Sequence, residues 1–221
     1  MLKLKDIHKS YQQGSQEFPI LKGIDLHVKE GDFLAIMGPS GSGKSTLMNI
    51  IGCLDKASSG TYHIEGTDVS ELSDNQLSDL RNQKIGFVFQ NFNLIEGLSV
   101  YENLLAPFAL TNFKANVREE MIKRALELAN IAHKRDENVS NLSGGERQRC
   151  AVARALSMDA DIILADEPTA NLDRDNARAF LGLLESFKAL KKSVIVATHD
   201  SIFDELGATD RALILQNGEI V

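Results

Sequence analysis

The sequence predicts an α/β fold: a mainly parallel core sheet with flanking helices, an antiparallel β lobe and an α-helical lobe. Three observations predict it. Short uninterrupted apolar runs alternate with helical patterns, the N-terminal region alternates with period two, and the middle of the chain has helical periodicity. The chain has 221 residues, of which 43% are hydrophobic, and this is enough to bury a core. We expect a single domain over residues 1–221.

The N-terminal part of the chain predicts the antiparallel lobe. Residues 2–5 and 24–28 alternate apolar and polar side chains, as half-buried strands do. Residues 61–66 resemble one arm of a hairpin, and residues 12–18 are expected to form a turn. These segments predict a small antiparallel sheet beside the main one.

Four apolar runs predict the core sheet. They cover residues 33–37, 162–165, 194–197 and 212–215. Continuous apolar runs indicate strands that are covered on both faces, which is typical of parallel sheets. The helical patterns between them supply the crossover connections, and one helix is expected to begin at about Lys44.

The middle of the chain predicts the helical lobe, at about residues 91–157. Residues 99–142 have a helical pattern, and six apolar side chains fall on one helical face: Val117, Met121, Ile122, Ala125, Leu128 and Ala129. We expect this stripe to pack in the core.

Charge and composition exclude several classes of protein. A formal net charge of −7 argues against a general nucleic-acid binder and against a polybasic membrane anchor. No segment reaches the ~18 apolar residues of a membrane span, and the N-terminus lacks the apolar centre of a signal peptide. We expect a cytosolic chain whose membrane role requires a separate protein or a spanning domain outside this sequence. Cys53 and Cys150 are expected to be buried, reduced side chains.

A glycine-rich segment after the first core strand predicts a phosphate site. It matches the pattern GxxxxGK[ST] with Gly38, Pro39, Ser40, Gly41, Ser42, Gly43, Lys44, Ser45 and Thr46. Glycines let backbone N–H groups converge on phosphate oxygens, and the following helix adds its positive N-terminal end. We expect Lys44 to reach the β and γ phosphates and Ser45 to bind Mg²⁺.

Two adjacent carboxylates end another core strand. Asp166 is suited to hold Mg²⁺, directly or through water, and Glu167 is suited to orient or deprotonate an attacking water. The prediction assumes that strand alternation points the two side chains in different directions. An ordinary acidic strand end is the alternative, which the nearby phosphate loop disfavours.

A second helix start has the features of an anion site. Ser143, Gly144 and Gly145 precede Glu146, and this spacing predicts a capping box at a helix N-terminus. The exposed N-terminus of such a helix also binds anions. Because one phosphate loop already serves the chain's own ATP, this second site most economically serves the ATP of a partner subunit.

Residues 142–148, LSGGERQ, resemble the signature motif of ABC ATPases, which belong to the P-loop NTPases. The resemblance covers essentially the whole chain and implies ATP and Mg²⁺ as cofactors. It implies that Gln90 contacts Mg²⁺ and water, and that His199 contacts the γ-phosphate. It also implies that Asp173 lies in a loop along the dimer seam and that Tyr11 stacks on adenine.

The same resemblance implies how such a domain works. Two copies pair head to tail, and each ATP lies between Lys44 of one copy and Ser143 to Gly145 of the other. Loss of the γ-phosphate loosens the dimer, and this opening can do mechanical work on a membrane protein.

Two classes of ABC protein are weighed. Soluble ABC ATPases of DNA repair, chromosome structure or translation are the alternative, but those of repair and chromosome type carry long insertions. Only 51 residues separate Gln90 from Leu142 here. Translation-type members carry two such domains in one chain. We therefore favour the motor subunit of a transporter, on the inner face of the cell membrane.

Within transporters the chain is similar to the lipoprotein-release and macrolide-export group (LolD/MacB-like). The similarity lies in residues 80–83, 86–94, 102–103, 164–169 and 171–173, and Glu96 and Ala170 depart from the residues expected at their positions. It implies an integral membrane permease as partner and no direct contact with cargo. The permease is expected to dock near residues 91–109. Four side chains there either contact it or pack inside the helical lobe: Phe92, Leu94, Ile95 and Leu98.

Overall fold

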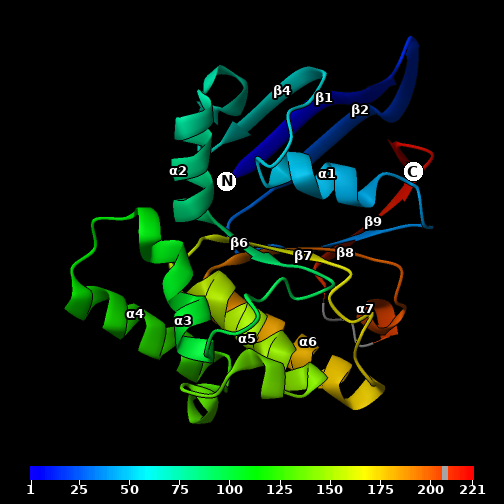
Figure 1. Ribbon diagram of the computed structural model, residues 1–221. Helices are drawn as coiled ribbons and strands as arrows, with labels where there is room; N and C mark the ends of the chain where they lie inside the picture. Colours follow the sequence, from blue (N-terminus) through cyan, green and yellow to red (C-terminus); the bar gives the residue numbers. More distant parts are fainter. Residues whose placement is uncertain (206–208) are drawn as a thin grey trace.

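The structure is a computed structural model that describes residues 1–205 and 209–221, without the side chains of residues 110, 204 and 205. Two sheets organise this part of the chain (Figure 1). The larger sheet has six strands in the order β10-β9-β3-β8-β7-β6, and the smaller has four in the order β2-β1-β4-β5. A mainly parallel sheet beside a smaller antiparallel sheet is the α/β arrangement that the sequence predicted.

The larger sheet is parallel except at one edge. Strands β3, β6, β7, β8 and β9 pair in parallel, and β10 pairs with β9 in the antiparallel direction. Their bounds are Phe33–Met37 (β3), Ile85–Val88 (β6), Ile162–Asp166 (β7), Ser193–Thr198 (β8), Arg211–Gln216 (β9) and Glu219–Ile220 (β10). The four predicted core strands are therefore confirmed.

The last of these four strands is less covered than expected. In β9 only Leu215 is buried, and Ile214 is 51% exposed. Strand β9 is separated from the edge of the sheet by the two-residue strand β10 alone, so neighbouring elements cover it incompletely. The apolar run correctly predicted a strand here, but the prediction that this strand is buried on both faces is wrong.

The smaller sheet is antiparallel, as predicted. Its strands are Leu2–Gln13 (β1), Gln16–Val28 (β2), Ser59–Ile64 (β4) and Thr67–Asp68 (β5). The expected turn over residues 12–18 is wrong, because β1 and β2 extend to a two-residue loop at Gly14 and Ser15. Gly14 has φ +64°, which a glycine adopts at little cost in such a hairpin loop.

Helices cover both faces of the larger sheet. They are Lys44–Ile51 (α1), Asp74–Lys84 (α2), Val100–Leu105 (α3), Ala115–Leu128 (α4), Gly144–Leu156 (α5), Arg174–Ala189 (α6) and Ile202–Glu205 (α7). Short 3-10 helices cover Val69–Glu71, Ala106–Leu110, Ala132–Lys134 and Val139–Asn141. Figure 1 shows α1 between the two sheets, with α5 and α6 on the opposite face of the larger sheet.

Two apolar cores follow from this layering. Alternate residues of the buried strands face opposite cores: Phe33 and Val194 face the core of α5 and α6, whereas Leu34 and Ile195 face the core around α1. The predicted stripe on α4 packs in the first core, with Ile122 fully buried; Val117, at one end of it, is 38% exposed.

Candidate functional site

The phosphate loop joins β3 to α1 and depends on glycine. Gly38 has φ +150°, and a Cβ atom there would lie 2.1 Å from the carbonyl oxygen of Leu215. Gly43 has φ +106° and caps the N-terminus of α1, and a Cβ atom there would lie 2.9 Å from the side chain of Leu21. Backbone this close to its neighbours admits only glycine. The N-terminal end of α1 is thereby aimed at the loop.

Parallel strands place the predicted residues at one edge of the sheet. Because β3, β6, β7 and β8 run the same way, the segments that follow them meet there. They form a pocket of about 460 Å³. Its lining includes Ser40, Gly41, Gly43, Lys44, Ser45, Thr46, Gln90, Glu167 and His199, together with Ile20 of β2. The structure thus brings together most of the predicted site.

Lys44 and Glu167 face each other in this pocket. The ammonium group of Lys44 is buried and donates hydrogen bonds to the carbonyl oxygens of Gly38, at 2.7 Å, and Pro39, at 3.1 Å. It lies 3.6 Å from Oε1 of Glu167. The other carboxylate oxygen, Oε2, lies 2.9 Å from Nδ1 of His199. Lysine, carboxylate and imidazole therefore form one contiguous group.

The orientation of Glu167 has a different cause from the one predicted. Strand β7 ends at Asp166, and Glu167 has φ +45°, in the left-handed region. Its backbone N–H donates to the carbonyl oxygen of Ala197 at 2.8 Å. The two carboxylates diverge because the chain turns at Glu167, and not because of strand alternation. Non-glycine residues seldom adopt this backbone, and active sites are among the places where they do.

Asp166 has the properties of a cation ligand. Burial raises the pKa of this carboxyl group, and interaction with the hydroxyl of Ser45 opposes the rise. Its Oδ1 atom is buried and has no hydrogen-bond partner among the described residues. Mg²⁺ prefers few protein oxygen ligands, together with phosphates and waters. Ser45, Gln90 and Asp166 therefore fit a Mg²⁺ site, although no group of three or more His, Cys, Asp or Glu side chains gathers as a metal cage in the described part of the chain.

Tyr11 lies beside the phosphate loop and outside the pocket lining. Its ring is 42% exposed, and its hydroxyl donates to Oδ2 of Asp55 at 2.8 Å. Lys9 lies 4.8 Å from the ring centroid. Burial and the Asp55 carboxylate raise the pKa of the tyrosine, and its hydroxyl also interacts with Thr46 of the phosphate loop. The exposed ring is thus fixed close to α1.

The remaining predicted residues lie outside this pocket. Ser143 caps α5 and forms the predicted capping box with Glu146; Ser143 and Gly144 are exposed. Asp173 caps α6 by accepting the backbone N–H of Asn176 at 2.8 Å. A Cβ atom at Gly145 would lie 2.5 Å from Asn176, so the starts of α5 and α6 touch. These residues form a second, separate cluster.

Several contacts of the site were missed by sequence reasoning. Thr198 donates to Glu167 at 3.3 Å, Asn171 donates to the carbonyl oxygen of Gln90 at 2.9 Å, and Asp55 holds Tyr11. Thr198 directly precedes His199, and Asn171 lies in the turn that follows Glu167. Proximity in sequence to a predicted residue was therefore an available signal for both. Asp55 carries no such signal because its role depends on the tertiary fold.

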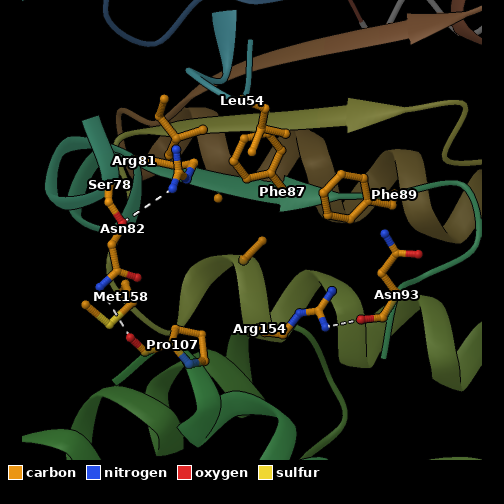
Figure 2. Close-up of a pocket in the computed structure, with 13 residues that line it drawn as sticks. Leu54, Ser78, Arg81, Asn82, Phe87, Phe89, Asn93, Pro107, Arg154 and Met158 are labelled. Carbon is orange, nitrogen blue, oxygen red and sulfur yellow. Dashed lines mark hydrogen bonds between the residues drawn. The ribbon is translucent and has the colours of Figure 1, made fainter. Parts of the chain in front are cut away.

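A second hollow lies between the core and the helices of residues 100–156. It is a groove of about 400 Å³ (Figure 2). Figure 2 shows Phe87 and Phe89 side by side on one wall with Arg81 near Phe87, and Arg154 on α5 across the groove. The four side chains predicted either to contact a permease or to pack inside the helical lobe differ in burial. Leu94 packs against the core, whereas Ile95 is 46% exposed. Of the predicted docking segment 91–109, Asn93 and Pro107 line the groove, and the other lining residues lie outside that segment.

The fold and the site define a P-loop ATPase: a glycine loop, a lysine and a serine at a helix start, opposite paired carboxylates at the end of a neighbouring strand. Residues 21–170 match the ABC transporter family. The chain belongs to this family, and it is an ATP-binding, ATP-hydrolysing subunit of the transporter type.

Relatives of known sequence support this assignment. The chain is 44% identical over 221 residues to an uncharacterized ABC transporter ATP-binding protein of Bacillus subtilis, YvrO, covering all of this chain and 96% of the relative. It is 39% identical to the macrolide export ATP-binding/permease protein MacB of Mannheimia succiniciproducens, covering all of this chain and 34% of MacB.

Solved structures agree with the fold. The ATP-binding cassette MJ0796 of Methanocaldococcus jannaschii, in a dimeric post-hydrolysis state bound to ADP and Pi, has a TM-score of 0.88 at 40% identity. The similarity covers all of this chain and 96% of that one. In the described part of this chain, no helix is both long and apolar enough to cross a membrane.

Proposed function

We propose that the chain works as a head-to-tail homodimer in which each ATP lies between Lys44 of one copy and Ser143 to Gly145 of the other. The observation that carries this proposal is the position of α5. Its N-terminal turn, where Ser143 and Gly144 are exposed, has backbone N–H groups without carbonyl partners in the helix, and it lies outside the pocket of Lys44. The dimeric state of the relative bound to ADP and Pi supports the same arrangement.

Within one site, each residue has a distinct proposed role. Gly38 to Thr46 hold the phosphates, and the ring of Tyr11 stacks on adenine. His199 contacts the γ-phosphate, and Asp173 lies along the dimer seam. ATP carries about four negative charges, which Lys44 and two helix N-termini would balance.

The cation site belongs to the same proposal. Ser45, Gln90 and Asp166 would hold Mg²⁺ directly or through water. When bound, the metal neutralises charge on the phosphates. Glu167, fixed by Thr198 and His199, orients a water molecule toward the γ-phosphate and accepts its proton at Oε1 or Oε2.

We propose that residues 1–221 act as one domain, with residues 91–157 as its helical lobe, and that the groove of Figure 2 receives an integral membrane permease. The groove combines apolar side chains such as Phe87 with Arg81 and Arg154, neither of which forms an ion pair within the described residues. It therefore suits an apolar segment with a carboxylate. We therefore propose that the chain works at the inner face of the membrane, away from the cargo.

The similarity to MacB favours a permease of the lipoprotein-release or macrolide-export group, whose cargo is a lipoprotein, a peptide or an antibiotic. A cysteine in place of Leu54, which lines the groove, should crosslink to the co-expressed permease in membranes. A cysteine in place of Thr61, on β4, should not. Because Cys53 and Cys150 are buried, native thiols contribute little background. Equal crosslinking at both positions would contradict docking in the groove.

The head-to-tail arrangement is tested with Ser143→Arg. In a Glu167→Gln background with ATP, sizing chromatography should give a dimer, and Ser143→Arg should give a monomer that still binds ATP through Lys44. Ser70→Arg, at another exposed serine, next to the β lobe, should leave the dimer intact. A dimer that survives Ser143→Arg would contradict the shared site.

A further inference from the structure

The backbone just after Gln90 is strained. Phe92 and Asn93 have φ values of +59° and +47°, so two consecutive residues lie in the left-handed region. Asparagine tolerates this region, but phenylalanine rarely adopts it because Cβ approaches the following carbonyl oxygen. Neither residue is a glycine, so other contacts must hold the segment in this conformation.

Arg154 supplies part of those contacts, in addition to the backbone hydrogen bond that Phe92 N–H donates to the carbonyl oxygen of Phe89 at 2.9 Å. Arg154 lies on α5, and its guanidinium group donates one hydrogen bond to the carbonyl oxygen of Asn93 and another, at 2.8 Å, to that of Phe92. Burial lowers the pKa of the guanidinium group. No ion pair of the described residues includes Arg154, so a half-buried cation has two carbonyl oxygens as its partners. These two hydrogen bonds from one guanidinium group fix Phe92 and Asn93 at once.

A second tether holds the other end of the segment. The side chain of Asn171 donates to the carbonyl oxygen of Gln90 at 2.9 Å. Gln90 thus lies between a contact to Asn171, which follows the paired carboxylates, and the two residues held by Arg154, in the last turn of α5.

We propose that Arg154 is a positioning residue that sets the place of Gln90 in the phosphate pocket and makes that place sensitive to what occupies the groove. The groove lining includes Phe89, Asn93 and Arg154 (Figure 2). A carboxylate of a docked segment that draws the guanidinium away would release the carbonyl oxygens of Phe92 and Asn93. Gln90 would then move while the phosphate loop stayed in place. This inference rests on the proposed role of Gln90 at the metal.

The test compares Arg154→Lys and Arg154→Met with the unchanged chain, without a permease. Lysine keeps the positive charge but lacks the planar guanidinium group that donates to two carbonyl oxygens. Methionine removes the charge and keeps much of the apolar stem. Both variants should bind a fluorescent ATP analogue without Mg²⁺ as the unchanged chain does. Their kcat should fall by about tenfold, and half-saturating Mg²⁺ should rise by about fivefold, because the defect lies at Gln90. Thermal unfolding reports whether each variant is folded.

A glycine rescue separates positioning from a purely structural role. Phe92→Gly relieves the strain that Arg154 balances, so it should restore at least about half of the kcat lost in Arg154→Met. The single Phe92→Gly variant is the reference for the double variant. A normal Mg²⁺ dependence in folded Arg154→Met, or no rescue by glycine, would overturn the proposal.

Gln90→Ala distinguishes this failure from failure of the proposed function. If Gln90→Ala lowers kcat and Arg154→Met does not, Gln90 keeps its role and the positioning role of Arg154 is wrong. If Gln90→Ala leaves both kcat and Mg²⁺ dependence unchanged, the assignment of Gln90 itself is wrong.

Discussion

Nδ1 of His199 lies 2.9 Å from Oε2 of Glu167, which joins the end of β8 to the end of β7. The same oxygen lies 3.3 Å from the hydroxyl of Thr198. These contacts fix the carboxylate by one oxygen and leave Oε1 facing Lys44, 3.6 Å away. A base fixed in this way can orient water without having to find its own position in each turnover.

Glu167→Gln should retain ATP binding and lose turnover. The amide has nearly the same shape as the carboxylate, but it cannot accept a proton from water. We expect kcat to fall by about two orders of magnitude or more. Phosphate release and the affinity for ATP measure the two properties separately, and Glu185→Gln on the exposed side of α6 is the control. Turnover that equals that of the unchanged chain would rule out Glu167 as the base.

Thr169 is hydrogen-bonded to the residue that follows His199. Its buried hydroxyl donates to Oδ2 of Asp200 at 2.7 Å. Thr169→Val keeps the shape and leaves Asp200 without this donor, which should cost about 1–3 kcal/mol of unfolding free energy. Because Asp200 follows His199, kcat should fall severalfold, and Thr169→Ser should retain most of it. Urea unfolding and ATPase assays measure both effects; equal loss in Val and Ser variants would contradict a role for this hydrogen bond.

The core strands could be predicted because their burial on both faces leaves a continuous apolar run. The same reasoning overestimated the burial of β9, because Ile214 is apolar and yet exposed. It also placed a turn at residues 12–18, where polar residues such as Gln13 and Gln16 form the exposed end of a hairpin. Cross-strand pairing can extend exposed strands through polar residues, and a pattern of burial cannot report this.

The site could be predicted where its residues follow one another in sequence. Gly38 to Thr46 and the pair Asp166 and Glu167 are of this kind. The left-handed turn at Glu167 and the paired hydrogen bonds of Arg154 arise from contacts between distant segments, so sequence spacing gives no signal for them.

Gly38→Ala should destabilise the fold at the phosphate loop. A methyl group there meets the carbonyl oxygen of Leu215 at 2.1 Å, and backbone cannot move aside as a side chain can. We expect a loss of about 3 kcal/mol in the free energy of unfolding. Gly14→Ala, at φ +64° with open space around it, should lose about 1 kcal/mol. Urea unfolding curves measure both losses, from the shift in midpoint where the dependence of the unfolding free energy on urea is unchanged. Equal losses in the two variants would show that the close approach of Gly38 to Leu215 is unimportant.

The two thiols should be unreactive in the folded chain. Burial raises the pKa of Cys53 to about 11 and that of Cys150 to about 12. At pH 8 only about one Cys53 in a thousand is a thiolate, so alkylation by iodoacetamide should be slow and should become fast in urea. Their pKa values are higher in the folded chain than the ordinary value of 9.0. Their contribution to stability is therefore complete below pH 9 and is lost as the pH rises towards 11 and 12. Rapid labelling at pH 8 without urea would contradict this burial.

The ring of Tyr11 should contribute to ATP affinity separately from its hydroxyl. Stacking of a base on an aromatic side chain contributes about 1–3 kcal/mol, so Tyr11→Ala should raise the Kd for ATP by about tenfold. Tyr11→Phe keeps the ring and loses the hydrogen bond to Asp55, so its Kd should rise by about threefold or less. Phe18→Ala removes another exposed aromatic ring, which faces Tyr11 across the hairpin, and controls for general effects on this lobe. Isothermal titration with ATP and with free triphosphate separates the base from the phosphates. If Tyr11→Ala weakens triphosphate as much as ATP, the ring supports the phosphate loop through Thr46 and does not bind adenine.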